Sequence, residues 1–261
     1  MLCGPIATYI RNESISFRFP LDCATNADNS VTITSYTGPV GAVTIPNTIN
    51  KLRVTSIETN AFAGSGLVNL TIPGSIATIG DWAFYGCQSL TNVTLSDGVT
   101  NIGNYAFLDC PSLAGITIPD SVTNLGVESF ASCTNLGHAF FEGNAPATMG
   151  PIPVFSGLKS NAMGYYLLGK AGWGPTYSGL PTVLWNPQVS LGDGSFDILA
   201  HQFGFHITGN AHIPIVVEAC TNLNSGAWVQ LQSVTLTNSL FYFTDPQWTN
   251  YPGRFYRLRV P

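Results

Sequence analysis

The sequence predicts a mainly β chain, in which a repeat solenoid with N- and C-terminal caps is followed by a small antiparallel β-sandwich. Near-copies of one unit are bounded by Ile72, Leu95, Ile118 and Phe141, at a constant step of 23 residues. A fixed period of about 20 to 50 residues indicates a solenoid, whose units bury their apolar faces by stacking. The 261 residues are 45% apolar, which is enough for a sizeable core. Beyond the repeats, short alternating strands with no helical stretch favour a sandwich.

Composition and charge exclude several classes of partner. Only 9% of the residues are charged, against roughly 25% in an average soluble domain. A net charge of −5 with nine Lys and Arg residues provides no basic surface for nucleic acid or an anionic membrane. No apolar run approaches the roughly 18 residues of a membrane-spanning helix. The start, 1–11, shows no export signal, which says little about location because a signal is removed from a mature protein.

Residues 1–43 are expected to form an N-terminal β cap. Segments 14–19 and 30–34 alternate polar and apolar residues, as half-buried strands do. A solenoid end exposes apolar side chains and needs such a cover. The repeats themselves are assigned to 44–142, with four extra residues bulging as a loop around 50–53 in the first of them.

Equivalent positions of the repeats are expected to stack as apolar core columns. A cysteine column with a serine one unit earlier is expected to pack in the same way, since one column does not bring metal ligands together from several directions. We therefore expect no metal site and no cofactor. Cys3 and Cys23 are able to pair if the protein is exported, which leaves Cys220 without an obvious partner. The columns are Val54/Ile76/Val99/Val122, Ile57/Ile79/Ile102/Leu125, Phe62/Phe84/Phe107/Phe130, Leu67/Leu90/Leu113/Leu136 and Ser65/Cys87/Cys110/Cys133.

After residue 142 the period fails. Segment 143–187 is rich in Gly, Pro and aromatic residues and is interpreted as the C-terminal cap. Pro interrupts strands, so Asn186-Pro-Gln188 is the expected boundary, and 188–261 the expected sandwich domain.

Two outward rows of the repeats are candidate binding surfaces. The strand of each unit points one row outward at Asn69, Asn92, Gly115 and His138, and a second at Thr71, Thr94, Thr117 and Phe140. A flat face of neutral amides and hydroxyls suits a sugar or a protein, although an ordinary solvated β face has the same composition. Three aligned Thr residues also leave an ice-binding interpretation open.

A third row, of Asn60, Trp82, Tyr105 and Glu128, carries aromatic side chains beside Asp81 and Asn104. Aromatic rings stack on the apolar faces of sugars, so the row is a candidate carbohydrate platform. The alternative is that Trp82 and Tyr105 pack over the adjacent turn.

Two pairs of carboxylates are candidate catalytic residues. Asp97 and Asp120 occupy one turn position in successive units, so their carboxyl groups could approach to about 5 Å, the separation in a retaining glycosidase. Asp81 with Glu128 is a second possible pair. The members of both pairs are also ordinary turn residues. Asp193 and Asp197 flank a turn without the full spacing of a calcium loop, and no third ligand supports His206 with His212. No nucleophile elbow or phosphate loop is present.

The motif running from Ile72 to Thr94, I-P-G-S-I-A-T-I-G-D-W-A-F-Y-G-C-Q-S-L-T-N-V-T, with copies from Leu95 and Ile118, resembles the BspA-type leucine-rich repeat of bacterial surface and secreted proteins. The stretch through 172–185 resembles the cap that follows such repeats, and 217–257 a fibronectin-III-like module. The resemblance implies adhesion to proteins, cells or glycans and supplies no catalytic residues.

The sequence therefore predicts a secreted or cell-surface recognition module that binds a glycan or a protein through the outward face of the solenoid. The alternatives are a glycoside hydrolase on the same scaffold and a structural spacer. The candidate ligand-binding residues are Trp82, Tyr105, Glu128, Asn104, Asn69, Thr71, Asn92, Thr94, Thr117 and His138. No oligomeric state is assigned.

Overall fold

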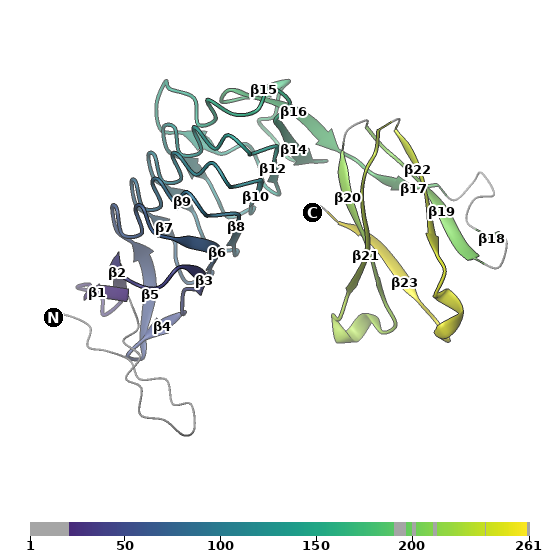
Figure 1. Ribbon diagram of the computed structural model, residues 1–261, viewed down its shortest axis with the longest axis horizontal. Helices are drawn as coiled ribbons and strands as arrows, with labels where there is room; N and C mark the ends of the chain where they lie inside the picture. The colour runs from purple at the N-terminus through teal and green to yellow at the C-terminus, as the bar shows by residue number, and fades with distance from the viewer. Residues whose placement is uncertain (1–20, 191–196, 200–201, 211–212, 238, 260–261) are drawn as a thin grey trace. The chain divides into compact units, whose positions relative to one another are not determined.

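The computed structural model describes residues 21–190, 197–199, 202–210, 213–237 and 239–259. The chain divides into two compact units, one ending at Thr182 and one beginning at Val183. Within the described residues, the regular structure consists of β-strands and two short 3-10 helices. The predicted fold class is confirmed, since a β-solenoid precedes a set of antiparallel sheets (Figure 1).

Each coil of unit 1 contributes two strands, and strands of successive coils pair in parallel. On one side, a sheet runs in the order β1-β2-β5-β7-β9-β11-β13. On the other side, β3-β6-β8 form one sheet and β10-β12-β14-β16-β15 another, with β8 and β10 in contact. The bounds on the first side are β5 (Leu52–Ile57), β7 (Thr78–Ile79), β9 (Asn101–Ile102), β11 (Asn124–Leu125) and β13 (Ala147–Thr148), and on the second β3 (Gly41–Thr44), β6 (Leu67–Ile72), β8 (Asn92–Leu95), β10 (Gly115–Ile118), β12 (His138–Phe141) and β14 (Met163–Leu167).

The N-terminal end of the sheet is covered by an antiparallel pair, β1 (Leu21–Thr25) and β2 (Val31–Tyr36). β2 continues in parallel to β5, so the expected 30–34 strand joins the solenoid directly. The short β4 (Thr48–Ile49) pairs with β5 and begins the bulge expected around residues 50–53. The expected strand at 14–19 lies outside the described residues.

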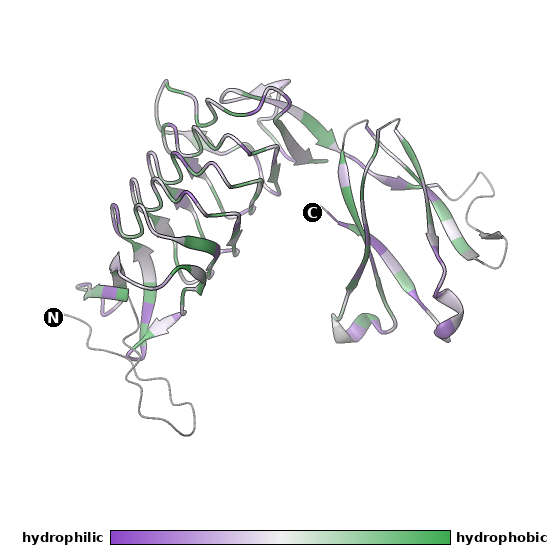
Figure 2. Cartoon of the chain, in the orientation of Figure 1, coloured by the Kyte–Doolittle hydropathy of each residue, from purple (hydrophilic) through white to green (hydrophobic). Residues whose placement is uncertain are grey.

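The predicted core columns are buried except at Ser65, which is half-buried, and hydrophobic segments recur in the strands of successive coils (Figure 2). The phenylalanine column is a stack of rings with centroids 4.9 Å apart for Phe62/Phe84 and Phe84/Phe107, and 5.2 Å for Phe107/Phe130. Phe155 extends the stack at 5.5 Å. Offset rings at this spacing gain stability beyond the area that they bury. The column therefore binds successive coils together.

The cysteine column is buried, as expected. Cys87, Cys110 and Cys133 are free thiols, and each donates to the carbonyl of a phenylalanine in the preceding coil at 3.2–3.3 Å. Hydrogen bonding with the neighbouring Cys133 and Cys87 thiols, together with burial, raises the pKa of Cys110. This column is a packing element.

The turn side of each coil contains two residues in the left-handed region. One column consists of Asn60, Trp82, Tyr105 and Glu128, with φ between 50° and 61°. The other, four residues later in each coil, is glycine in two coils and Asp109 and Ser132 in the next two. Between them, the backbone N–H groups of one coil donate to carbonyls of the next, for example Phe84 N to Ala106 O at 2.7 Å. The turns thus repeat one strained conformation.

The C-terminal end of the solenoid is closed by β14, β15 (Thr176–Tyr177) and β16 (Leu180–Trp185). Tyr177 and Trp173 pack on Phe141, with ring centroids at 5.5 Å and 4.6 Å. The Trp173 indole donates to Gly143 O at 3.2 Å. These aromatic side chains cover the core where the repeat period ends.

The described residues of unit 2 form two antiparallel sheets. One contains β17 (Gln188–Val189), β18 (Asp197–Leu199), β19 (Gln202–Thr208) and β22 (Leu240–Asp245), and the other β20 (Pro214–Cys220), β21 (Val229–Thr235) and β23 (Phe255–Arg259). The Tyr256 ring packs between Phe205 and Phe243 at 5.7 Å and 6.0 Å, joining the two sheets. The 3-10 helices are η1 (Leu223–Ser225) and η2 (Trp248–Asn250).

One buried carboxylate in unit 2 is fully paired. Burial alone would raise the pKa of Glu218, but hydrogen bonds from Arg259 and Arg257 outweigh that effect and lower it. The Arg257 guanidinium also lies over the Trp228 ring, 4.3 Å from its centroid.

Candidate recognition surfaces

The first candidate surface is the outward face of β6, β8 and β10, called here the polar face. In the parallel register Asn69 lies beside Asn92, and Thr71 beside Thr94. Thr117 occupies the same position in β10. Because side chains alternate along a strand, the intervening residues, such as Leu70 and Val93, are buried in the core. The sequence-predicted rows therefore share one face.

The polar groups of this face have no hydrogen-bond partners among the described residues. Asn69, Asn92 and Thr94 are exposed, Thr71 and Thr117 are half-buried, and in the described part of the chain none of these five side chains makes a hydrogen bond. Elsewhere in the coils, polar side chains bridge to the coil before. Thr91, Thr100 and Thr123 all donate to carbonyls of the preceding coil, at 3.0, 3.1 and 3.3 Å. These five side chains of the polar face thus keep their hydrogen-bonding groups available to a ligand.

The two rows end at His138 and Phe140, whose side chains are aromatic rather than amides or hydroxyls. The His138 ring covers Gly115, where an added Cβ would lie 2.0 Å from its Nε2 atom. Burial lowers the pKa of His138, which favours the neutral imidazole. Phe140 is buried and stacks on Tyr165 at 5.0 Å. The rows therefore pass from amides and hydroxyls into an uncharged aromatic region.

Carboxylates follow the strands of the polar face. Glu142 comes directly after β12, and burial together with the charges of Asp97 and Asp120 raises its pKa. Asp120 is paired with Lys170, its Oδ2 atom lying 3.0 Å from Nζ. No group of three or more His, Cys, Asp or Glu side chains in the described residues is arranged to hold a metal ion. Asp97 and Asp120 remain a possible acid pair only as a prediction.

The second candidate surface is the aromatic strip, formed by Trp82, Tyr85 and Tyr105. The Trp82 and Tyr105 rings stack with centroids 4.1 Å apart, and Tyr85 meets Trp82 edge-on at 5.2 Å. Trp82 and Tyr105 are half-buried, while Tyr85 is exposed. Left-handed backbone costs roughly 1–2 kcal/mol for an L-residue. Trp82 and Tyr105 both adopt this conformation, which Asn60 at the equivalent position tolerates better.

The polar neighbours of the strip have structural partners. Asp81 accepts from Asn104 N at 2.7 Å and from its Nδ2 at 3.3 Å. Asn104 Oδ1 in turn accepts from Val127 N at 2.9 Å. This ladder of side chain to backbone bonds joins three coils, which favours a structural role for Asp81 and Asn104. Glu128 is half-buried at the next position of the left-handed column.

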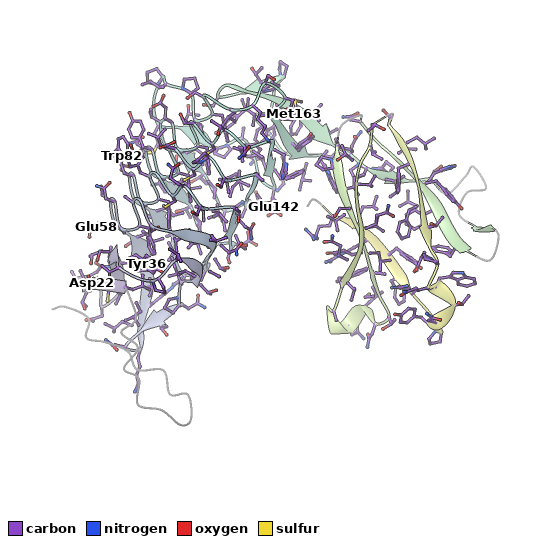
Figure 3. All side chains as sticks on the ribbon, in the orientation of Figure 1. Asp22, Tyr36, Glu58, Trp82, Glu142 and Met163 are labelled. Carbon is purple, nitrogen blue, oxygen red and sulfur yellow. The ribbon has the colours of Figure 1, made fainter. Side chains whose placement is uncertain are left out.

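The two surfaces lie on different sides of the coils. Trp82 is on the turn side, whereas Glu142, at the end of β12, is on the side of the polar face (Figure 3). The structure therefore brings Asn69, Thr71, Asn92, Thr94 and Thr117 together, and separately Trp82 with Tyr105.

Several sequence predictions fall wholly or partly outside the described residues. Cys23 is disulfide-bonded, and its expected partner Cys3 lies outside them. Cys220 is a free, buried thiol. Asp193, and His212 as the expected neighbour of His206, also lie outside the described residues.

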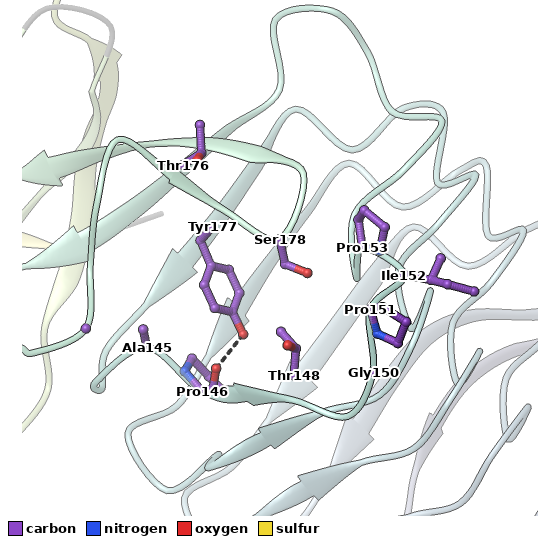
Figure 4. A pocket seen from close by; sticks show the side chains of 11 residues that line it. Ala145, Pro146, Thr148, Gly150, Pro151, Ile152, Pro153, Thr176, Tyr177 and Ser178 are labelled. Carbon is purple, nitrogen blue, oxygen red and sulfur yellow. Dashed lines mark hydrogen bonds between the residues drawn. The ribbon is translucent and has the colours of Figure 1, made fainter.

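A pocket of about 470 Å³ lies at the C-terminal end of the solenoid, which sequence reasoning missed (Figure 4). Its lining residues come from two segments, 145–153 of the last coil and 172–178 of the cap. The Tyr177 hydroxyl crosses it to donate to Pro146 O at 2.8 Å. These residues lie where the repeat period has failed, so no column pointed to them.

Stacked coils with a phenylalanine column inside and a leucine-bearing strand on one side define a leucine-rich-repeat protein. A family model described as "BspA type Leucine rich repeat region" matches residues 55–149 in six copies. A leucine-rich-repeat protein of T. pallidum, known from its crystal structure, is 32% identical, with a TM-score of 0.51, over 57% of this chain and 69% of that one. The chain belongs to the BspA-type leucine-rich-repeat family.

Other solved structures are also similar. A leucine-rich-repeat protein from Bacteroides capillosus is 29% identical over 50% of this chain and 100% of that chain, with a TM-score of 0.42. A leucine rich cell surface protein from Faecalibacterium prausnitzii is 20% identical over 77% and 59%, with a TM-score of 0.37. No curated protein matches the chain. The fibronectin-III-like character of the last domain stays a prediction.

No helix among the described residues is long and apolar enough to cross a membrane.

Proposed function

We propose that this protein is a recognition module that binds a protein or glycan ligand through the polar face. The observation that carries the proposal is the set of unpartnered amides and hydroxyls on β6, β8 and β10, in a repeat that pairs many of its other polar side chains between coils. Groups that already face water are free to exchange it for a ligand's donors and acceptors. The repeat spaces them at the roughly 4.8 Å separation of neighbouring strands.

A disulfide supports a location outside the reducing cytosol. Cys23 is disulfide-bonded, and disulfides persist mainly in oxidising compartments. We therefore propose that the protein is secreted or held at a cell surface, which agrees with an adhesive role.

The test is a screen of the full chain against arrays of immobilised extracellular proteins and glycans. The triple variant Asn69→Ala/Asn92→Ala/Thr94→Ala removes polar groups without changing charge or the buried columns. We expect it to lose at least about tenfold in affinity for any ligand that the parent captures, equivalent to ~1.4 kcal/mol. Unchanged binding by a folded triple variant would show that the polar face is not the binding surface.

The aromatic strip is proposed as a second contact surface, for a glycan. What supports it is the strained backbone at Trp82 and Tyr105, since such conformations are often retained at functional sites. The double variant Trp82→Ala/Tyr105→Ala should weaken capture of glycans and leave protein ligands unaffected. Glycan binding that survives this change would leave the rings as turn packing.

A further inference from the structure

The last strand of the repeat sheet, β13, has an open edge. Among the described strands it is terminal in the sheet, and its one partner there is β11. Ala147 N and Met149 N donate to Thr123 O and Leu125 O, at 2.8 and 3.0 Å. Because successive residues of a strand point their backbone groups to opposite sides, the N–H and C=O of Thr148 face away from β11. They face the pocket, which Thr148 lines.

Before and after Thr148, residues of the cap make hydrogen bonds to the last coil, as a next coil would. Among the described residues, none is made to Thr148 itself. Just before β13, the Tyr177 hydroxyl donates a hydrogen bond to the carbonyl oxygen of Pro146 at 2.8 Å. Toward the following turn, Ser178 Oγ accepts from Val154 N at 2.8 Å and Ser178 O from Phe155 N at 3.1 Å. Between these contacts lies the pocket, in the place of a missing strand (Figure 4).

One wall of the pocket beside this edge is apolar. Pro151, Ile152 and Pro153 line one side, with Ile152 45% exposed. Prolines donate no backbone hydrogen bond, so Pro146, Pro151 and Pro153 prevent long strands from pairing along this edge. Only a short segment in register with Thr148 has both backbone partners and apolar contact.

We propose that this pocket binds an extended peptide segment of a protein partner, which adds to β13 as one further strand. Strand addition uses main-chain hydrogen bonds for affinity and side-chain pockets for selectivity. Here the peptide pairs with the Thr148 N–H and C=O and places an apolar side chain against Ile152 and the prolines. The site goes beyond the polar face and does not depend on it. With so few contacts the Kd is expected at roughly 0.1–1 mM.

The repeat itself provides the probe. In the preceding coil, Asn124 N and Gly126 N donate to Thr100 O and Ile102 O, at 3.3 and 2.8 Å. A labelled peptide copying residues 122–127, Val-Thr-Asn-Leu-Gly-Val, should therefore pair with β13 as the next coil would. Its glycine N–H would donate to Thr148 O, whereas its leucine N–H would point away.

The measurement is fluorescence anisotropy of this peptide with the full chain. N-methylation of the peptide glycine should weaken binding at least about tenfold, and N-methylation of the leucine should leave it within about twofold, because only the first blocks a bond to β13. Equal affinities for the two N-methyl peptides, or no saturable binding up to roughly 1 mM, overturn the proposal.

Two variants of Thr148 test the proposed peptide binding independently. Thr148→Pro removes the edge N–H and should weaken binding about tenfold, whereas Thr148→Val keeps it and should bind as the parent does. If Thr148→Pro does not fold, the methylated peptides with the parent chain still decide. If the parent instead self-associates and Thr148→Pro abolishes this, the edge belongs to a second copy and the proposal fails.

Discussion

Ser129 interrupts an alanine column in the core and offers a clear stability test. The hydroxyl of Ser129 is fully buried and has no hydrogen-bond partner within the described residues. The equivalent positions in the preceding coils are Ala61, Ala83 and Ala106, all buried. The column therefore accepts a methyl group, and Ser129→Ala removes an unpaired polar atom without a change of packing.

The magnitude follows from desolvation. Burying a hydroxyl without a partner costs about 1–3 kcal/mol in protein mutational data, so Ser129→Ala should stabilise unit 1 by an amount in this range. Each 1 kcal/mol corresponds to about 2–4 °C in Tm for a unit of 150–250 residues. The reverse change, Ala106→Ser, places a hydroxyl in the equivalent site and should lower the Tm by a similar amount.

Both variants are measured against the parent by urea unfolding and scanning calorimetry. Opposite shifts with unchanged m-values would support the assignment, because the surface exposed on unfolding is the same. A Ser129→Ala protein that is less stable than the parent would refute it, since the hydroxyl must then be bonded in the native state.

Three further predictions concern other columns and the charges near the polar face. Phe107→Ala should cost about 3–5 kcal/mol, because its ring contacts Phe84 and Phe130 in the buried stack, while Tyr85→Ala, on the exposed turn, should cost far less by the same urea assay. The buried thiols of Cys87, Cys110 and Cys133 should resist a thiol reagent at pH 8 and react only as fast as unit 1 unfolds, and rapid labelling of the native protein would contradict their packing role. Glu142 has a pKa raised above 4.5, so its folded form favours the proton and loses stability as pH rises through the folded pKa. Glu142→Gln should therefore raise the Tm at pH 7 and have little effect at pH about 4, and a Tm that falls at pH 7 would contradict this.

The core of this fold could be predicted from the sequence because its determinants repeat. A 23-residue step places Phe84, Phe107 and Phe130 in one column, and burial of an apolar column follows from stacking alone. The outward rows followed equally, since alternation along β8 fixes that Asn92 and Thr94 face out when Val93 faces in.

What could not be predicted depends on backbone conformation and on side-chain rotamers. Nothing local marks Trp82 and Tyr105 as left-handed, because the turn imposes a conformation that these residues do not prefer. The only available signal was Asn60, which tolerates that region, at the equivalent position. The bonds from Asn104 to Asp81 were likewise hidden, since the same carboxylate also fits a catalytic interpretation.

The pocket beside β13 escaped prediction for a different reason. It forms where the period ends, between Thr148 of the last coil and Tyr177 of the cap, which are 29 residues apart. No column or spacing relates these two residues, so only the folded chain brings them together.

The most direct test of recognition by the polar face compares matched charge variants on two sides of the coils, using the strongest ligand from the array screen. Asn92→Lys/Thr94→Lys charges the polar face, and Thr59→Lys/Thr78→Lys adds the same charge at exposed residues beside β5 and on β7. If the polar face is the recognition surface, the first variant loses at least about tenfold in Kd and the second stays within about twofold of the parent. Equal losses of affinity, or a loss confined to the second variant, would contradict the assignment of the polar face as the recognition surface.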